Sequence, residues 1–239
     1  MSLRSTIATP EGKAPFVRSL FATIANRYDL ITVLLSYGQD RRWKRRLIDL
    51  ASPLRGRRVL DLACGTGDLA FAAAAQGGEV TGLDLTARMI ELARGKTPAA
   101  GVRFLVGDMM ALPFRDTSFD VVTTGYGLRN VPVLETTIAE IHRVLAPGGL
   151  LLSLDFNRPA NATLRAAYLA YLSVVGSVVG ALLHRNPDTY RYIAESIRHY
   201  PGAPGVVDRL EAAGFTGVEW RPVLGGLMAI HVAHRRAAA

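Results

Sequence analysis

Short apolar runs alternate with amphipathic segments between residues 57 and 154, and this alternation limits the fold more than any other feature of the chain. Apolar runs of this length predict buried strands, whereas most of the segments between them carry apolar residues at helical spacing. Strands joined through helices run parallel, and a parallel sheet needs helices on both faces. We therefore expect strands at 57–62, 79–83, 102–106, 119–124 and 150–154, and helices at 68–76, 86–96 and 134–145, the second capped by Thr86 and the third stopped at Pro147-Gly148-Gly149.

The segments on either side of this core have different patterns. Before it, apolar residues at helical spacing predict a helical cap, which Pro53 and Gly56 separate from the first strand. After it, a second helical stretch is followed by a helix and by two strands that can form a hairpin at Gly225-Gly226. The expected fold is therefore α/β, with seven mostly parallel strands and an antiparallel strand at the end of the sheet. We expect one domain over 1–239, divided into the cap (15–52), the core (57–155), the helical insertion (160–200) and the C-terminal helix and hairpin (205–234).

The charge of the chain favours an acidic partner. The formal net charge is +8 at pH 7, which is typical of proteins that meet nucleic acid or an anionic membrane face. Much of the excess lies in the run RRWKRR (41–46), whose simplest interpretation is the solvated face of a helix. Cys64 is the only cysteine, so no internal disulfide can form, and the polar N-terminus has no apolar stretch typical of a signal peptide. These features predict a cytoplasmic protein.

A glycine-rich turn follows the first predicted strand, in the segment RVLDLACGTGDLA (58–70). The turn fits the pattern G-x-G-x-x-G/A, in which the backbone approaches a bound nucleotide closely, but this match alone has little specificity. Asp84 ends the second strand, where a carboxylate can hold a pair of ribose hydroxyls. Nicotinamide cofactors and S-adenosylmethionine share both features.

Other acids near the turn distinguish these two ligands. A pyrophosphate binds the positive end of a helix and is repelled by carboxylates, whereas Asp61 precedes the turn and Asp68 lies at the helix start. The alternative interpretation of Asp68 is an ordinary helix N-cap. Asp108 follows the third strand, where an adenine edge would lie, and Met109 can pack on the ring. Acids at the ends of three consecutive strands favour S-adenosylmethionine, a cation that leaves as S-adenosylhomocysteine.

Beyond these residues, nearly the whole chain, from about Phe16 to Ala233, resembles the ubiquinone/menaquinone biosynthesis C-methyltransferase family, within the class I S-adenosylmethionine-dependent methyltransferases. The resemblance implies that family's Rossmann-like fold and the methylation of a ring carbon of a polyprenyl quinol, most often demethylmenaquinol. It also implies cofactor contacts at Thr66, Asp84, Asp108 and Met109. The motifs that carry it are NRYDLI (26–31), DRRWKRR (40–46), DLACGTGD (61–68), ALPF (111–114), GYGLRNV (125–131), VLAPGGLLLSLDFNRP (144–159) and YRYIAESI (190–197). The complete set expected at the cofactor is Asp61, Gly65, Thr66, Gly67, Asp84, Leu85, Asp108, Met109 and Gly125.

The chain departs from the family pattern at a few positions. Cys64 stands where the family usually has glycine, Thr32-Val33 replace its Asn-Asp, and Asp40 replaces its His. The last two departures lie in the cap that can shape a substrate pocket. The choice between a naphthoquinol and a benzoquinol therefore stays open, as does the length of the prenyl chain.

The loop after the fourth strand is expected to face the methyl donor. Methylation of carbon needs an electron-rich ring, best supplied by a hydroquinone that loses a phenolic proton. In this loop Arg129 can stabilise a phenolate, Asn130 can orient a hydroxyl or a water, and Tyr126 is a third catalytic candidate. The alternative for Arg129 and Asn130 is a structural pair that closes the loop. Weaker candidates are Tyr28, Asp29, Tyr190, Tyr192 and Glu195, and the scattered histidines predict no metal site.

Rival functions come from other classes. A nucleic-acid methyltransferase would suit the charge, but the loop GYGLRN (125–130) lacks the Asn-Pro-Pro-aromatic pattern that holds a flipped base. A cytosine-C5 mechanism is excluded because the lone cysteine lies in the cofactor turn. A small-molecule O- or N-methyltransferase would have the same fold and is the main alternative. An inactive scaffold is disfavoured by the intact acids at the strand ends.

The segment AAYLAYLSVVGSVVGALL (166–183) carries no charge and has almost the length of a membrane span. Gly176 and Gly180 are expected to weaken a long helix here, and a span would separate the final hairpin from its sheet. We interpret the segment as a lid over the substrate mouth that grips a polyprenyl tail or touches the membrane, with a buried core helix as the plainer alternative. The expected partners are a lipophilic quinol and an anionic membrane surface, to which a cytoplasmic protein binds peripherally, with no nucleic acid. A homodimer is allowed by the sequence.

Overall fold

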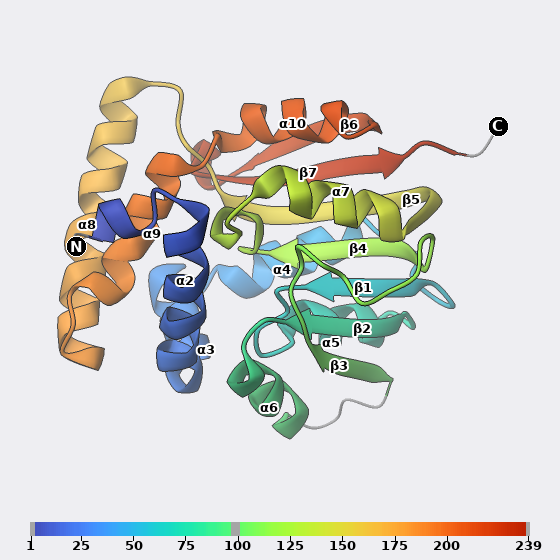
Figure 1. The fold of residues 1–239 in the computed structure, drawn as a ribbon, viewed down its shortest axis with the longest axis horizontal. Helices are drawn as coiled ribbons and strands as arrows, with labels where there is room; N and C mark the ends of the chain where they lie inside the picture. The colour runs from blue at the N-terminus through green and yellow to red at the C-terminus, as the bar shows by residue number, and fades with distance from the viewer. Residues whose placement is uncertain (1–2, 97–100, 238–239) are drawn as a thin grey trace.

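A seven-stranded sheet forms the centre of the protein in the computed structural model, which describes residues 3–96 and 101–237 (Figure 1). The strand order is β3-β2-β1-β4-β5-β7-β6, with the first five strands of the chain parallel. The prediction of a mostly parallel sheet with a C-terminal hairpin is confirmed. The strands are β1 (Arg58–Leu62), β2 (Glu79–Asp84), β3 (Val102–Val106), β4 (Phe119–Gly125), β5 (Leu145–Phe156), β6 (Phe215–Val223) and β7 (Met228–Arg235).

The antiparallel hairpin ends the sheet, as predicted, and its second strand lies on the inner side. β7 lies between β5 and β6 and is antiparallel to both, so the edge strand is β6. The helices that follow β5 lead the chain to the edge of the sheet, where β6 forms, and leave a position between β5 and β6. The short turn η3 (Leu224–Gly226) allows only an antiparallel pairing with β6, and β7 therefore occupies that position.

Helices cover both faces of the sheet, as the alternating pattern predicts. Apolar residues of α4 (Asp40–Asp49) and α5 (Asp68–Ala75) pack on one face, while α7 (Leu134–Val144) and α10 (Gly202–Ala212) pack on the other. The helix α6 (Ala87–Gly95) covers β2 and β3. Each face is thereby sealed by a separate apolar cluster, which burial of nonpolar surface stabilises.

Three local details differ from the prediction. The N-cap of α5 is Gly67 rather than Asp68, which lies in the first helical turn. Thr86 is the N-cap of α6, but its side chain makes no capping hydrogen bond. The strand β5 already begins at Leu145, so Pro147-Gly148-Gly149 lie within it, beside an irregularity in the pairing with β4. The ladder hydrogen bonds with β4 are recovered immediately after this irregularity, and they outweigh the turn preference of Pro-Gly.

The N-terminal helices and the insertion gather at the carboxyl ends of the parallel strands (Figure 1). They are α1 (Leu3–Thr6), α2 (Pro10–Ile24), η1 (Ala25–Arg27), α3 (Tyr28–Leu35), α8 (Ala162–His184) and α9 (Asp188–His199). Leu20, Ile24 and Ile31 share one buried cluster with Tyr190 and Tyr192, which joins the cap to the insertion. Segments far apart in the sequence thus form one helical layer over the strand ends.

The helix α8 is continuous, although its glycines were expected to weaken it. Gly176 and Gly180 are buried against α9 and its preceding turn, and a Cβ at Gly176 would lie 2.6 Å from the carbonyl oxygen of Tyr190. The glycines therefore allow close helix packing, which offsets their low helix propensity. Among the residues that the structure describes, α8 is the one helix that is long and apolar enough to cross a membrane, by length and composition only.

Substitution of Gly176 by valine should destabilise the fold. The added side chain meets backbone of α9, which cannot move aside, so we expect a loss of about 1–3 kcal/mol in the free energy of unfolding, measured in urea. Ala170→Val adds similar bulk at an exposed position of the same helix and should cost under about 1 kcal/mol. Equal stability of the two variants would contradict the packing role of Gly176.

Candidate functional site

A cavity of about 100 Å³ lies at the carboxyl ends of β1, β2 and β4, where the order of the parallel strands switches. Ligands of open α/β sheets bind at such switch points. The cavity, called here the strand-end cavity, contains many of the residues expected at the cofactor. They are Gly65, Asp84, Leu85, Asp108, Met109 and Gly125.

Asp84 is held rigidly at the floor of the glycine turn. Its Oδ2 accepts a hydrogen bond from the backbone N–H of Gly65, and its Oδ1 accepts one from Thr86, each at 2.8 Å. Burial raises the pKa of this carboxyl, although both N–H groups favour the charged form. Each oxygen retains a lone pair, so the side chain can also accept hydrogen bonds from two ligand hydroxyls.

Asp61 has an oxygen without a partner. The side chain is buried at the end of β1, and its Oδ1 accepts a hydrogen bond of 2.9 Å from the hydroxyl of Thr123. Its Oδ2 is buried and has no hydrogen-bond partner among the described residues, and burial raises the pKa of the carboxyl to about 7. A buried acceptor is costly when unpaired, so a cationic donor bound here would be stabilised.

A small hollow beside Asp61 contains the remaining polar groups of the turn. Thr66, Asp68 and Lys44 line it together with Asp61. Asp68 is paired with Lys44 at 3.0 Å and with Lys96 at 3.3 Å, so its charge is already balanced. Asp68 therefore repels a pyrophosphate less than its place in the sequence implied. Discrimination against a pyrophosphate then depends mainly on the charge of Asp61.

The cap contributes to the same region through Asp29. This carboxylate accepts a hydrogen bond from the hydroxyl of Thr66 and forms an ion pair of 2.7 Å with Lys96. The start of α3 is thus attached to the glycine turn. Gly67, in contrast, lines neither the strand-end cavity nor the hollow, and its positive φ of 92° serves the turn itself, because a Cβ there would lie 2.8 Å from the ring of Phe71.

These residues fit S-adenosylmethionine. The orphaned oxygen of Asp61 suits the ammonium group of the methionine part, and the fixed carboxylate of Asp84 suits the ribose. Met109 is buried and lines the strand-end cavity beside Asp108, where an apolar ring can pack. Asp84 and Asp108 line the strand-end cavity, whereas Asp61 lines the adjoining hollow, which shares Ala63 and Gly125 with that cavity.

A second cavity, of about 510 Å³, lies between the cap and the insertion. Its lining is almost wholly apolar and aromatic, with residues from α2, α3, α8 and α9; we call it the helix cavity. Three of the weaker candidates from the sequence line it, namely Tyr28, Tyr190 and Tyr192. Four residues line both cavities, namely Phe21, Tyr28, Tyr126 and Asn130. The two cavities are therefore adjacent and share these side chains as a common wall.

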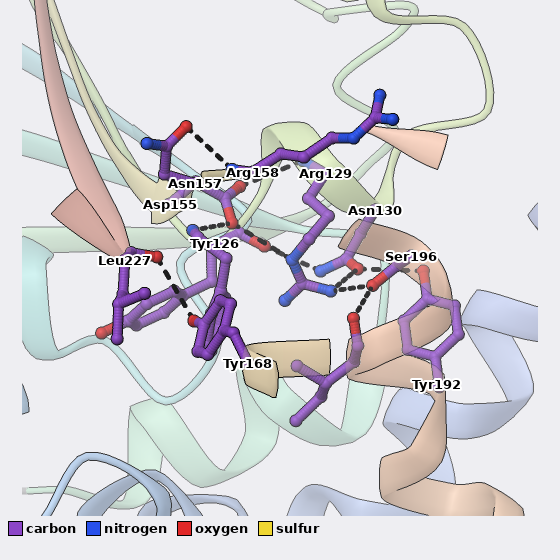
Figure 2. A network of polar contacts seen from close by, with 12 residues as sticks. Tyr126, Arg129, Asn130, Asp155, Asn157, Arg158, Tyr168, Tyr192, Ser196 and Leu227 are labelled. Atoms are coloured by element: carbon purple, nitrogen blue, oxygen red, sulfur yellow. Dashed lines mark hydrogen bonds and ion pairs between the residues drawn. The ribbon is translucent and has the colours of Figure 1, made fainter. Parts of the chain in front are cut away.

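Arg129 lies at the inner end of the helix cavity and is held by several partners (Figure 2). Its Nε pairs with Asp155 Oδ1 at 3.2 Å, and its Nη1 donates to the hydroxyl of Ser196 at 2.6 Å. The guanidinium lies 4.9 Å from the ring centre of Phe156. Its charge is thus balanced by a fully buried carboxylate, and its orientation is fixed by contacts with two elements, β5 and α9.

Asn130 is similarly constrained. Its Nδ2 donates to the carbonyl oxygen of Tyr126 at 2.7 Å, and its Oδ1 accepts from the hydroxyl of Tyr192 at 3.0 Å (Figure 2). Both members of the pair therefore close the loop, as the structural alternative proposes, and both also line the helix cavity. The two interpretations are compatible in this fold.

Several residues of the site escaped the sequence reasoning. Asp155 ends the apolar run of β5, the same signal that identified Asp61 at the end of β1. Lys13 of α2 donates to the carbonyl oxygens of Arg129 (2.9 Å) and Val131 (2.7 Å). Burial, together with the charge of Arg129, lowers the pKa of Lys13 to about 8. No local pattern marks such a residue, because its partners lie more than a hundred residues away.

Part of the basic run in α4 is also not what the sequence suggested. Arg41, Arg42, Arg45 and Arg46 are exposed, in keeping with a solvated face, but Lys44 is buried and belongs to the site. Although burial opposes its charge, the ion pair with Asp40 at 2.7 Å raises the pKa of Lys44. Of the weaker candidates, Glu195 does not line the helix cavity and instead pairs with Arg4 and Arg198.

The chain is similar to proteins of known families along almost its whole length. The model of the ubiE/COQ5 methyltransferase family matches residues 9–235. A demethylmenaquinone methyltransferase of Thermus thermophilus is 43% identical over 220 residues, which cover 90% of this chain and 100% of that protein. A ubiquinone/menaquinone biosynthesis C-methyltransferase UbiE of Stutzerimonas stutzeri is 42% identical over 226 residues, covering 92% of this chain and 88% of the relative.

The fold is similar to that of solved methyltransferases. An S-adenosylmethionine-dependent methyltransferase of Thermotoga maritima superposes with a TM-score of 0.67, covering 92% of this chain and 100% of that one, at 18% identity. The CurJ carbon methyltransferase superposes with a TM-score of 0.57 over 77% of this chain and 50% of its own, also at 18% identity. These similarities establish the Rossmann-like methyltransferase fold.

Binding of S-adenosylmethionine should depend on pH through Asp61. Because its pKa in the free protein is about 7, the carboxylate is present above that pH and protonated below it, and only the carboxylate attracts the ammonium group. We expect the affinity, measured by calorimetry, to fall about tenfold between pH 8 and pH 6. Asp61→Asn should bind weakly with little dependence on pH. An equally steep dependence in this variant would contradict the assignment.

Proposed function

This chain belongs to the ubiE/COQ5 methyltransferase family, and we propose that it transfers a methyl group from S-adenosylmethionine to a ring carbon of a polyprenyl quinol, foremost demethylmenaquinol. The observation that carries the proposal is the contact between its two cavities. One has charged groups suited to a cationic nucleotide, and the other is large and apolar. Relatives named for quinone methylation support the choice of substrate.

The cofactor residues have distinct tasks in this proposal. S-adenosylmethionine supplies an electrophilic methyl group on a positively charged sulfur. Asp61 holds the ammonium group, Asp84 accepts from the ribose hydroxyls, and Asp108 and Met109 form the adenine end of the cavity. The backbone of the strand-end cavity can approach the ligand closely at Gly65, Leu85 and Gly125. Thr66 fixes the turn to the cap through Asp29.

The quinol ring is placed at the junction of the two cavities, with its tail in the helix cavity. Arg129 faces this cavity and stabilises negative charge that develops on the ring oxygen. Asn130 and Tyr126 line the junction and orient the ring hydroxyl. The apolar walls exclude water and hold the ring against the methyl donor, an effect that can supply several kcal/mol of the rate enhancement.

Methylation assays with labelled S-adenosylmethionine test the proposal. We expect the purified protein to methylate reduced demethylmenaquinone, and long-tailed quinols better than tail-less ones, because the helix cavity gains apolar contact along the tail. Demethoxy-type benzoquinols distinguish the two quinol classes. Methylation of small catechols or amines in place of quinols would favour the O- or N-methyltransferase alternative. Tight cofactor binding without any methylated quinol would refute the proposal.

We further propose that the mouth of the helix cavity meets an anionic membrane surface. Exposed apolar side chains lie on two of the helices that contribute to the lining of this cavity, Leu30, Val33 and Leu34 on α3 and Val174, Val178 and Leu182 on α8. Apolar side chains left exposed on a monomer can form an interaction surface. A lipid surface also supplies a quinol whose tail is insoluble in water.

The exposed arginines of α4 provide the charge for this contact. Arg42, Arg45 and Arg46 line a hollow together with Leu224, which also lines the helix cavity. In the described part of the chain, none of these arginines forms an ion pair. Basic residues at an anionic leaflet contribute about 1 kcal/mol each, so this cluster can hold the mouth against the membrane.

Sedimentation with vesicles tests the membrane contact. We expect the protein to bind vesicles rich in phosphatidylserine at low salt and to be released at high salt, since screening weakens the arginine contacts. Arg45→Gln/Arg46→Gln should weaken binding about tenfold or more. Arg55→Gln/Arg57→Gln removes the same charge before β1, at the other end of the strands, and should bind like the wild type. Equal loss in both variants would indicate a net-charge effect, and no binding at any salt would refute the contact.

A further inference from the structure

The reaction must take place where the two cavities meet. Only Phe21, Tyr28, Tyr126 and Asn130 line both of them within the described residues. The amide of Asn130 is already engaged on both sides by Tyr126 and Tyr192. Phe21 has no polar group. A proton that leaves a ring hydroxyl at this junction therefore meets a tyrosine first.

The helix cavity itself contains no ordinary base. Among the described residues that line it there is no Asp, Glu, His or Lys. The nearest carboxylates lie one side chain behind the wall, Asp155 behind Arg129 and Asp40 behind Tyr126. A guanidinium in a protein does not give up its proton, whereas a phenol can donate one proton while it accepts another.

Tyr126 is connected directly to a buried carboxylate. Its hydroxyl donates to Asp40 Oδ1 at 2.6 Å, and Asp40 is only 2% exposed. Tyr126 has a φ of 63°, a left-handed conformation that is costly for an aromatic residue and is found mostly where it serves a function. This backbone turn aims the ring from the end of β4 toward the start of α4.

The charged groups around Asp40 allow its carboxylate to take up a proton. Lys44 pairs with its second oxygen at 2.7 Å, and the same lysine is shared with Asp68 of α5. Tyr28 of α3 faces Lys44 and Asp40, and Asp155 is the further charge near Tyr126. Lys44 therefore keeps a partner when Asp40 takes up a proton, which limits the cost of neutralising that carboxylate.

We propose that Asp40 accepts, through Tyr126, the proton that the quinol hydroxyl loses during methyl transfer, an inference that rests on the proposed function. The O–H bond of the quinol breaks and its proton moves to Tyr126 Oη. The phenolic proton of Tyr126 moves at the same time to Asp40, so Tyr126 stays neutral. The electron pair of the broken O–H bond stays on the ring, and the ring carbon bonds the methyl group as the bond between methyl and sulfur breaks with its electron pair left on sulfur. The methylated carbon then loses its hydrogen as a proton to solvent, and Asp40 returns its proton through Tyr126 to the ring oxygen. The quinol hydroxyl and the Asp40 carboxylate are thereby restored, and one proton is released per methyl group transferred. Asp40 acts through Tyr126 and is a positioning residue.

A rival tyrosine, Tyr190, lines the same cavity and has a histidine behind it. The hydroxyl of Tyr190 is 2.9 Å from His184 Nε2, but Tyr190 does not line the strand-end cavity. It therefore contacts the tail region rather than the junction. This pair provides a matched control, a tyrosine with a base behind it that is away from the methyl donor.

The test compares pH–rate profiles for quinol methylation. Asp40→Asn and Tyr126→Phe should each lower kcat about 10²-fold at neutral pH. The deficit should shrink as the pH rises, because a quinol that ionises in solution needs no acceptor. Asp40→His, which can again accept a proton, should recover much of the rate. Tyr190→Phe should keep the shape of the wild-type profile, whatever its effect on substrate binding.

A second measurement does not depend on turnover. The phenol 1-naphthol resists oxidation, and its ionised form absorbs at longer wavelength, so its ionisation can be followed when it is bound with S-adenosylhomocysteine. It should ionise at lower pH in the wild type than in Asp40→Asn, with Tyr190→Phe like the wild type. Unchanged kcat profiles and naphthol ionisation in Asp40→Asn would overturn the role of Asp40 while leaving quinol methylation intact. Absence of quinol methylation by the wild type would instead refute the proposed function, and the naphthol titration would still decide on Asp40.

Discussion

The buried ion pair between Arg129 and Asp155 joins the parts of the chain that enclose the helix cavity. It connects the loop after β4 to the end of β5, and through Ser196 it reaches α9. Lys13 of α2 binds the backbone of the same loop, so the cap is attached at this point as well. Two buried charges are costly to desolvate, and removal of one partner leaves the other uncompensated at a cost of about 3–5 kcal/mol. The helices around the cavity are therefore held to the sheet by a pair of buried charges, neither of which can be removed without destabilising the other.

Charge is distributed unequally around the two cavities. The carboxylates of Asp61 and Asp84 lie at the strand ends, where burial raises their pKa values and a cationic ligand restores favourable pairing. Among the residues that the structure describes, no carboxylate lines the helix cavity, and the carboxylates of Asp40 and Asp155 lie behind Tyr126 and Arg129. In the proposed function, the charged nucleotide therefore contacts carboxylates, and the lipophilic quinol contacts apolar side chains.

Local sequence patterns identified most of the fold and predicted the residues proposed for the cofactor, because both depend on residues close together in the chain. Strands β1 to β4 were located almost to the residue, and the acids at their ends followed from position alone. The errors have a common origin in contacts between distant segments. Gly176 and Gly180 were expected to weaken a long helix, but they pack against α9 and its preceding turn. Asp68 was expected to repel an anion, but Lys44 and Lys96 pair with it.

The sequence by itself determined the parallel sheet, the glycine turn with its acids and the resemblance to quinone C-methyltransferases, since periodicity and motifs act over short distances. Only the tertiary structure decided that β7 inserts beside β5, that the cap and insertion enclose one apolar cavity, and that Tyr126 points at Asp40 across 86 residues of chain. A hydrogen bond or an ion pair depends on the position of two side chains in space. No local pattern specifies that position until the helices have packed over the strand ends.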